Sequence, residues 1–211
     1  MSRRVNRTST TRQKAELTDE IIKQVLGYWK AKGPRYHRVY LYLKLLANSG
    51  ARRSEALGFF PEDLQQLGSG EWVIRFRRQR SEGKAFSDKL KTSRSYGYAI
   101  LPPDLGKELS EFVEAHIIPD GKPIFDVGRY APNKWWTQTK KALGLDPRLR
   151  LHDFCSYYIK TVGPKVFAKV ENRELTHWDV EDYFRRSWKD IQKHYHIPKK
   201  PDELSGLTLN E

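Results

Sequence analysis

The sequence predicts an α+β fold that is mostly α-helical with a small antiparallel β-sheet. Apolar residues recur at helical spacing in several segments of the chain. In residues 72–77, by contrast, large apolar residues alternate with residues that are mostly basic, which is typical of a β-strand. Residues 96–101 are predicted to form the strand that returns beside it. At 211 residues the chain can bury one sizeable core. We therefore expect one domain over residues 15–197, flanked by a basic disordered arm, 1–14, and a C-terminal arm, 198–211.

The first half of the domain is predicted to contain two helices and then the strand pair. Thr18 is placed to cap the first helix, and Gly33–Pro34 is expected to end it. The second helix, about residues 38–49, is apolar around most of its circumference, which is typical of a central core helix. Residues 60–64 are interpreted as a short connection. The polar residues 78–91 would form the basic tip of an antiparallel hairpin.

The second half is predicted to be helical. Asp104 is placed to cap a helix that follows Pro102–Pro103, and another helix covers residues 133–143. A helix over residues 151–162 is expected to end at Gly163–Pro164. Short helices complete the domain, over residues 165–170, 179–184 and 188–194.

The charge of the chain indicates a polyanionic partner. It has 39 Lys and Arg residues against 26 Asp and Glu residues, a net charge of +13, and nucleic acid is the commonest partner of such a surplus. A membrane surface is the competing interpretation, but no apolar run approaches the length of a bilayer span. The single cysteine and the lack of a signal peptide favour the cytoplasm, or the host-cell cytoplasm if the protein is viral. Because no metal-ligand spacing is present, we predict no metal site.

The end of the second helix carries an unusual group of charges. This apolar helix leads directly into Gly50, Arg52 and Arg53, and Glu55 follows at once. Charged groups are buried only when they are paired. The pattern therefore favours an anion site with its own internal partner, and a basic loop with an exposed salt bridge is the alternative of about equal weight.

Further residues could complete a site for phosphodiester chemistry. Transfer to a protein nucleophile needs cations around the non-bridging oxygens, a general acid for the leaving 5′ oxygen and a nucleophile such as a tyrosine phenol. Neither a metal-ligand set nor a nucleotide-phosphate loop offers another route. The candidates are Arg52, Lys91, His152, His177 and a tyrosine near the C-terminus.

Four segments, in the right order, resemble the tyrosine recombinase (phage-type integrase) family. Residues 49–57, Ser-Gly-Ala-Arg-Arg-Ser-Glu-Ala-Leu, resemble the segment that carries the first catalytic arginine. Lys91-Thr92-Ser93 is similar to the lysine segment of the family's β-hairpin. Leu151-His152-Asp153-Phe154 and Glu174-Leu175-Thr176-His177-Trp178 resemble the two later segments, with their histidines 25 positions apart (177 − 152). The resemblance covers about residues 17–196 and implies the fold of the family's catalytic domain.

The resemblance also implies a role for each residue. Arg52 would grip the scissile phosphate, and Glu55 would support its loop. Lys91 would protonate the leaving 5′ hydroxyl, while His152 and His177 would hydrogen-bond the phosphate and help to manage the tyrosine proton. Outside this pattern, each histidine would more often be structural.

Other basic residues are expected to contact DNA. Lys84 and Lys89 share a loop with Lys91 and rival it as the general acid, and Arg53 is either a DNA contact or a surface neighbour of Arg52. The expected contacts are Arg53, Arg75, Arg77, Arg78, Arg80, Lys84, Lys89 and Arg94.

Cys155 departs from the family pattern, in which an arginine stands three positions after the first histidine. A cysteine cannot replace the bidentate phosphate clamp of an arginine, and the loss of one such donor typically slows a reaction about a hundredfold or more. Either another cation such as Lys160 or Arg150 substitutes, or the chain is a weakened recombinase, or it is a catalytically silent DNA-binding protein on the same fold.

The nucleophile departs from the pattern as well. The family commonly places its tyrosine nine positions after the third-segment histidine, and that position is Arg186 here. Tyr195 stands in a His-Tyr-His context similar to that of some archaeal virus and plasmid integrases, and it is the predicted nucleophile. Tyr183 is the alternative, although it is also placed for core packing beside Phe184.

The resemblance implies a reaction on double-stranded DNA without a metal or nucleotide cofactor. It suggests a homo-tetramer on paired DNA sites, and a monomer is possible without DNA. Family members usually carry a separate DNA-clamping domain, so we expect either a catalytic fragment or an unusually short recombinase. A basic RNA- or ribosome-associated protein would be favoured instead if RNA outcompeted duplex DNA.

Overall fold

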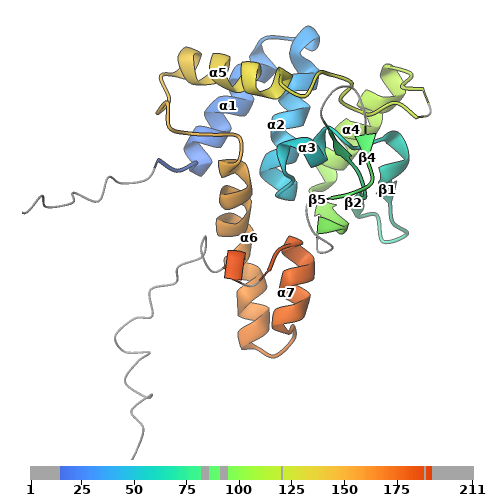
Figure 1. Cartoon of the computed structure of the whole chain (residues 1–211), viewed down its shortest axis with the longest axis vertical. Helices are drawn as coiled ribbons and strands as arrows, with labels where there is room; N and C mark the ends of the chain where they lie inside the picture. The colour runs from blue at the N-terminus through green and yellow to red at the C-terminus, as the bar shows by residue number, and fades with distance from the viewer. Residues whose placement is uncertain (1–14, 82–85, 91–94, 120, 188, 192–211) are drawn as a thin grey trace, which may run out of the picture.

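The computed structural model describes residues 15–81, 86–90, 95–119, 121–187 and 189–191 (Figure 1). It is mostly helical with small antiparallel sheets, which confirms the predicted fold class. The two predicted arms lie outside the described residues. The helices are α1 (Asp19–Ala31), α2 (His37–Ser49), α3 (Arg53–Ala56), α4 (Pro103–Ala115), α5 (Ala131–Leu143), α6 (Asp153–Glu171) and α7 (His177–Phe184), with 3-10 turns at Pro34–Tyr36 and Pro61–Asp63. The strands are β1 (Leu64–Gln66), β2 (Trp72–Phe76), β3 (Gln79–Arg80), β4 (Phe86–Ser87) and β5 (Gly97–Leu101).

The first two helices form as predicted. The side chain of Thr18 accepts a hydrogen bond from the backbone N–H of Ile21 at 3.3 Å and so caps α1. Gly33 has a φ of 82°, a conformation that glycine adopts readily, and the chain leaves the helix there. Almost every residue of α2 is buried, and it contacts α1, α4 and α6. It is therefore the central helix of the core.

The main sheet has the strand order β1-β2-β5 and is antiparallel. Ile74 lies opposite Ala99, which confirms the predicted strand pair. Leu64 pairs with Ile74 as well, so β1 adds a third strand where the sequence indicated a connection over residues 60–64. A second pair, β3 and β4, lies within the stretch 78–91 that was predicted to be a loop. Strands of two or three residues are too short to show an alternating pattern, which explains both differences.

Asp104 does not cap α4, contrary to the prediction. The N-cap residue is Pro102, and Asp104 lies in the first turn. Its carboxylate accepts a hydrogen bond from Lys44 Nζ at 2.6 Å, and that of Glu108 accepts another at 2.9 Å. The hydrogen bond from Lys44 lowers the pKa of Asp104. Lys44 is nearly buried on α2, so its ammonium group needs these partners, and the pairing joins α4 to the core helix.

Gly163–Pro164 does not end α6, which corrects the predicted break and merges the predicted helix over residues 165–170 into it. The helix runs through Pro164 to Glu171. A proline inside a helix removes one hydrogen bond and costs about 3 kcal/mol. The apolar residues on both sides of Pro164, including Tyr158 and Phe167, share one cluster with α7. Burial of that cluster offsets the cost.

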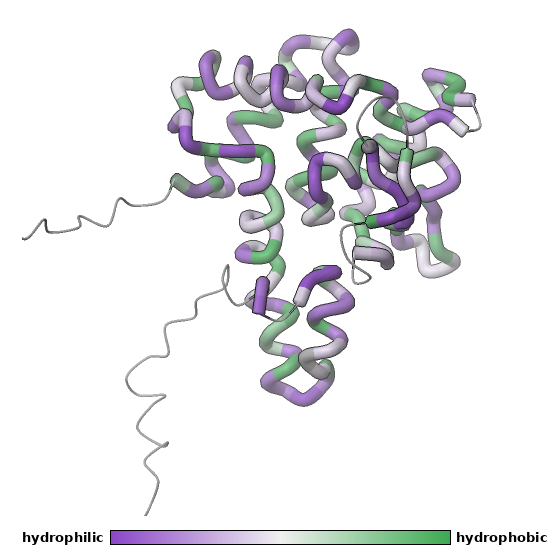
Figure 2. The backbone as a smooth tube through the Cα atoms, viewed as in Figure 1, coloured by the Kyte–Doolittle hydropathy of each residue, from purple (hydrophilic) through white to green (hydrophobic). Residues whose placement is uncertain are grey.

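The C-terminal half of α6 and α7 form an extension of the molecule with its own apolar cluster. Figure 1 shows α7 beside the lower half of α6, reaching away from the other elements, and the loop that joins the two helices is hydrophilic (Figure 2). Thr176 caps α7 through Asp179, so the helix begins at residue 177 rather than 179. No helix among the described residues is long and apolar enough to cross a membrane. The cluster comprises Tyr158, Ile159, Val166, Phe167, Val180, Phe184 and Ile191.

Candidate active site

The loop that follows α2 lies directly against α6. Gly50 ends α2 with a φ of 61°, in the left-handed region that favours glycine. A Cβ atom at this position would lie 2.6 Å from Cδ1 of Tyr158, closer than real contacts allow. Glycine therefore satisfies both the turn and the close approach of α6, and the turn delivers Arg52 to the meeting point of α2, α3 and α6.

Arg52 is oriented by Glu55. The Glu55 carboxylate accepts a hydrogen bond from the backbone N–H of Arg52 at 2.8 Å and one from its Nη1 at 2.5 Å. Nη1 also donates to Ser95 Oγ at 2.9 Å. The Glu55 side chain is 1% exposed, whereas the Arg52 side chain keeps 18% of its surface exposed. The guanidinium group is thus fixed on its buried side and accessible on the other, an arrangement that suits the binding of an anion.

Cys155 lies on the other side of the same loop. Its single S–H lies within hydrogen-bond reach of two carbonyl oxygens, those of Gly50 at 3.3 Å and Ala51 at 3.4 Å from Sγ, and the residue is buried. Burial raises the pKa of the thiol, although the nearby charge of Arg186 opposes this shift. The neutral thiol brings no positive charge to the site. His152 lies one helical turn earlier, exposed at the N-terminal end of α6.

Arg185 reaches this place from the end of α7, although the sequence analysis did not select it. Its Nη2 donates to the carbonyl oxygen of Ser49 at 3.0 Å, and its Nη1 lies 3.7 Å from the Glu55 carboxylate. The guanidinium carbon lies 3.1 Å from the ring centre of Phe76. Burial lowers the pKa of Arg185 to about 10, with Glu55 acting in the opposite direction. Arg52 and Arg185 therefore contact the same buried carboxylate.

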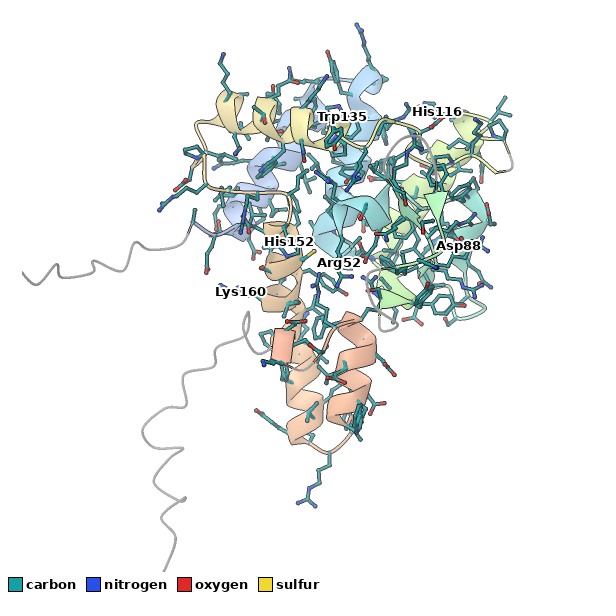
Figure 3. All side chains as sticks on the ribbon, in the orientation of Figure 1. Arg52, Asp88, His116, Trp135, His152 and Lys160 are labelled. Carbon is teal, nitrogen blue, oxygen red and sulfur yellow. The ribbon has the colours of Figure 1, made fainter. Side chains whose placement is uncertain are left out.

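Neither cation that the sequence offered in place of the missing arginine lies at this loop. Lys160 Nζ donates to Glu16 Oε2 at 2.5 Å, and Figure 3 shows it on the side of α6 away from Arg52. Arg150 is exposed and pairs with Asp153 at 3.8 Å. The structure instead places the guanidinium group of Arg185 beside the loop of Arg52.

The structure does not bring the backbone of His177 to this loop. The backbone N–H groups of Glu174 and Leu175, just before α7, donate to the carbonyl oxygen of Lys169 at 2.8 and 3.2 Å. Lys169 is 14 positions after Cys155 along α6 (169 − 155), a rise of roughly 21 Å. α7 therefore begins at the far end of α6 and returns along it, so that its last residues, rather than its first, approach Arg52 (Figure 1).

Three of the expected DNA contacts are engaged by carboxylates of the chain itself. Arg77 pairs with Glu62 at 3.0 Å and with Asp63. Arg78 pairs with Glu62 at 2.8 Å and Asp63 at 3.2 Å, and Arg80 lies 3.8 Å from Asp126. These arginines brace the sheet against the turn at Pro61–Asp63 and the loop of Asp126.

Other expected contacts are more accessible. Arg75 is exposed on β2, with its guanidinium carbon 5.9 Å from the ring centre of Tyr98 on β5. Lys89 is exposed, and its carbonyl oxygen accepts a hydrogen bond from the Gln79 side chain at 2.6 Å. Arg53 donates to the Asn133 side chain at 2.9 Å. Four residues selected from the sequence lie outside the described residues: Lys84, Lys91, Arg94 and Tyr195.

Tyr183 lies in α7, where it contacts Tyr158 of α6. Its hydroxyl is 3.4 Å from that of Tyr158. Both tyrosines line an open pocket of about 380 Å³ with residues of β5 and α6, and Arg52 is not among the lining residues described. In the part of the chain that the structure describes, no group of three or more His, Cys, Asp or Glu side chains is arranged to hold a metal ion.

Sequence reasoning missed two residues that contact the site. Ser95 precedes β5 and directly follows the selected residues Lys91 to Arg94, but a single serine there gave no signal of its own. Arg185 did carry a signal, because Arg185–Arg186 is an arginine pair at the end of a predicted helix, as Arg52–Arg53 is. The second arginine pair repeats the pattern of the first.

Comparisons with known proteins identify the architecture. The Tn1549 transposon integrase, in complex with circular intermediate DNA, superposes with a TM-score of 0.68 at 16% identity over 93% of this chain and 67% of that one. XerA recombinase gives 0.63 at 12% over 96% of this chain and 65% of that one. XerH site-specific recombinase, bound to its difH substrate, gives 0.63 at 14% over 92% of this chain and 54% of that one.

The sequence itself matches no family model and no curated protein. The chain spans between about half and two thirds of the length of these three structures. The matches nevertheless extend over more than nine tenths of this chain. The chain therefore has the fold of the tyrosine recombinase catalytic domain.

Proposed function

We propose that the protein is a DNA strand-transferase of the tyrosine recombinase type, which cleaves and rejoins DNA through a 3′-phosphotyrosyl intermediate. The observation that carries this proposal is Arg52, whose guanidinium group is held by Glu55 and Ser95 and remains accessible on one side. This geometry stabilises the negative charge that develops on a phosphate under attack. The net charge of +13 adds the long-range attraction that brings DNA to the site.

Each further role in the reaction is part of the same proposal. His152 hydrogen-bonds the phosphate from the N-terminal end of α6. Lys91 protonates the leaving 5′ oxygen, and Tyr195 is the nucleophile, with Tyr183 as its rival. The DNA-bound state of the Tn1549 integrase and XerH structures supports double-stranded DNA as the substrate, and a tetramer on paired sites is the assembly that we propose.

A covalent capture experiment tests this function without knowledge of the target sequence. The protein is mixed with a pool of nicked duplexes of random sequence, in which cleavage near the nick releases a short strand and traps the covalent complex. Denaturing gel electrophoresis then separates the protein–DNA adduct. We expect an adduct that Tyr195→Phe abolishes; an adduct lost only in Tyr183→Phe would make Tyr183 the nucleophile.

Arg52 and Arg53 provide a matched pair in this assay. Arg52→Ala should abolish the adduct, because it removes the accessible guanidinium group from the reacting phosphate. Arg53→Ala should mainly weaken DNA binding. It removes a positive charge, but the Arg53 guanidinium group is held by Asn133 on α5 rather than by Glu55 beside Arg52. The reverse result would show that the other arginine contacts the phosphate.

One observation favours a second candidate, a catalytically silent DNA-binding protein. Cys155 stands where the family carries an arginine, and its buried thiol is neutral. Salt-sensitive binding of duplex DNA with no adduct from any duplex of the pool, together with adduct formation by Cys155→Arg, would support this candidate over the first.

A further inference from the structure

Arg185 is held in an unusual state for an arginine. Its side chain is 3% exposed, packed on the ring of Phe76 and bonded to the carbonyl oxygen of Ser49. Its backbone has a φ of 53°, in the left-handed region that residues other than glycine avoid. Such a conformation persists only where the surrounding structure enforces it. The end of α7 is therefore fixed against the loop after α2.

Two of the three nitrogen atoms of the Arg185 guanidinium group have no hydrogen-bond acceptor among the residues that the structure describes. Within the described residues, Nε and Nη1 are buried and have no hydrogen-bond partner. The Glu55 carboxylate is 3.7 Å from Nη1, close enough for charge attraction but beyond hydrogen-bond range. Buried charged donors without acceptors are unfavourable, so the charge of Arg185 depends on the Glu55 carboxylate and favours further negative charge close by.

Arg186 extends this positive surface. It directly follows Arg185, its backbone N–H donates to the carbonyl oxygen of Glu181 at 3.0 Å, and its side chain is half-buried. Among the neighbouring charges, that of Arg186 has the largest effect on the thiol of Cys155 and favours its ionised form. Because the neighbouring Arg185 is held at Ser49 and Glu55, Arg186 adds a second positive charge at the end of α7 that packs on the loop after α2.

We infer that Arg185 and Arg186 form the second cationic wall of the phosphate site, in which Arg186 contacts a non-bridging oxygen and Arg185 is a positioning residue that holds Glu55 and the end of α7. This inference rests on the proposed function and assigns to it two residues that the sequence pattern did not select. It also gives the site a guanidinium group without an arginine at position 155.

The spacing along the chain agrees with this assignment. Tyr195 is nine positions after Arg186 (195 − 186), which is the separation that the resembled family commonly has between its third-segment histidine and the nucleophile. His177 is 18 positions before Tyr195 (195 − 177), and its backbone begins α7 at the far end of α6. Arg186 therefore takes the place in the site that the resemblance gave to His177.

The first arm of the test measures phosphate binding in the absence of DNA. Thermal unfolding is followed in inorganic phosphate and in chloride of equal ionic strength, because a ligand that binds only the folded state raises the unfolding temperature. The wild type should be stabilised by phosphate, and Arg186→Ala should lose that increment. Arg173→Ala is the control, since Arg173 is an exposed arginine that follows α6 at the end of the helix far from Cys155; it should keep the increment.

The second arm measures the rate of adduct formation with the nicked duplex pool. Arg186→Ala should slow adduct formation about a hundredfold or more, while Arg186→Lys and added guanidinium ions should restore part of the rate. Arg185→Lys, which keeps the charge but loses the planar fork, should slow the reaction while the phosphate increment in unfolding temperature is retained.

The two arms separate the failure of this inference from the failure of the proposed function. If the wild type forms an adduct and Arg186→Ala forms it equally fast, the inference is overturned and the function stands. If His177→Ala forms the adduct slowly while Arg186→Ala forms it at the wild-type rate, the inference is overturned and His177 is the residue that contacts the phosphate. If the wild type forms no adduct but Arg186→Ala loses the phosphate increment, the anion site stands and the strand-transfer function fails.

Discussion

The guanidinium group of Arg185 lies 3.7 Å from the carboxylate of Glu55, and both side chains are almost completely removed from solvent. Glu55 is also the acceptor that orients Arg52. Glu55→Gln would leave two guanidinium groups facing each other without a counter-charge. Loss of one partner from a buried ion pair typically costs about 3–5 kcal/mol, so we expect a decrease of that size in the free energy of unfolding, measured by urea titration.

Glu16→Gln is the control for that measurement. Glu16 pairs with Lys160 at 2.5 Å, but its side chain is 51% exposed. Exposed ion pairs contribute about 0–1 kcal/mol, so this variant should unfold almost as the wild type does. Equal, small losses in both variants would show that Glu55 is not the centre of a buried charge cluster.

The left-handed glycine at the end of α2 can be compared with a second one. Gly50 and Gly144 have φ values of 61° and 63°, but only the Cβ at position 50 would meet another side chain, that of Tyr158. Gly144→Ala should cost about 1 kcal/mol from the backbone alone. Gly50→Ala should cost about 1–3 kcal/mol more from overpacking, as measured by the difference in urea midpoint at a common m-value.

The thiol of Cys155 should be protected by the fold. Burial raises its pKa from the ordinary value of 9.0, so its thiolate fraction at pH 8 is smaller than in the unfolded chain. Alkylation by iodoacetamide should therefore be at least about a hundredfold slower in the native protein than in urea. Ser69→Cys in a Cys155→Ser background places a thiol at an exposed position and should react at the unfolded rate.

The same shift predicts a dependence of stability on pH. Above pH 9 the unfolded thiol loses its proton while the folded thiol keeps it, so the folded state binds more protons and the free energy of unfolding falls as the pH rises. Cys155→Ser should remove this part of the decline. An identical decline in both proteins would show that the buried thiol does not contribute to it.

The elements that the sequence predicted correctly are those whose pattern is local and long. α1 and α2 follow from helical spacing, from Thr18 at the first helix start and from Gly33 at its end, and the β2–β5 pair follows from alternation. The break predicted at Gly163–Pro164 was wrong because α7 packs across it, and packing by a distant segment is not visible in a local signal.

In the candidate site, too, the local contacts could be predicted from the sequence and the long-range contacts could not. Arg52 and Glu55 are three positions apart, so their pairing could be anticipated from spacing. Arg185 contacts the backbone of Ser49 across 136 positions of sequence. An arginine after a helix ordinarily indicates an exposed helix end, and its burial depends on how α6 and α7 fold back on the core. Only the tertiary structure brings these residues together.

Arg75 is the residue through which the sheet should contact DNA. It is exposed on β2, opposite in direction to the buried Ile74 and Phe76, and has no carboxylate partner among the residues described. If Arg75 neutralises one phosphate, Arg75→Ala should weaken binding to all duplex sequences and reduce the slope of log K against log salt concentration by about 1.

Lys107→Ala is the control, because Lys107 is 74% exposed on α4 and pairs with Glu111 at 3.8 Å. Binding measured by fluorescence anisotropy between 50 and 200 mM salt, roughly the range over which phosphate contacts dominate, should leave the Lys107→Ala slope unchanged; equal slopes in both variants would place the DNA on another face of the protein.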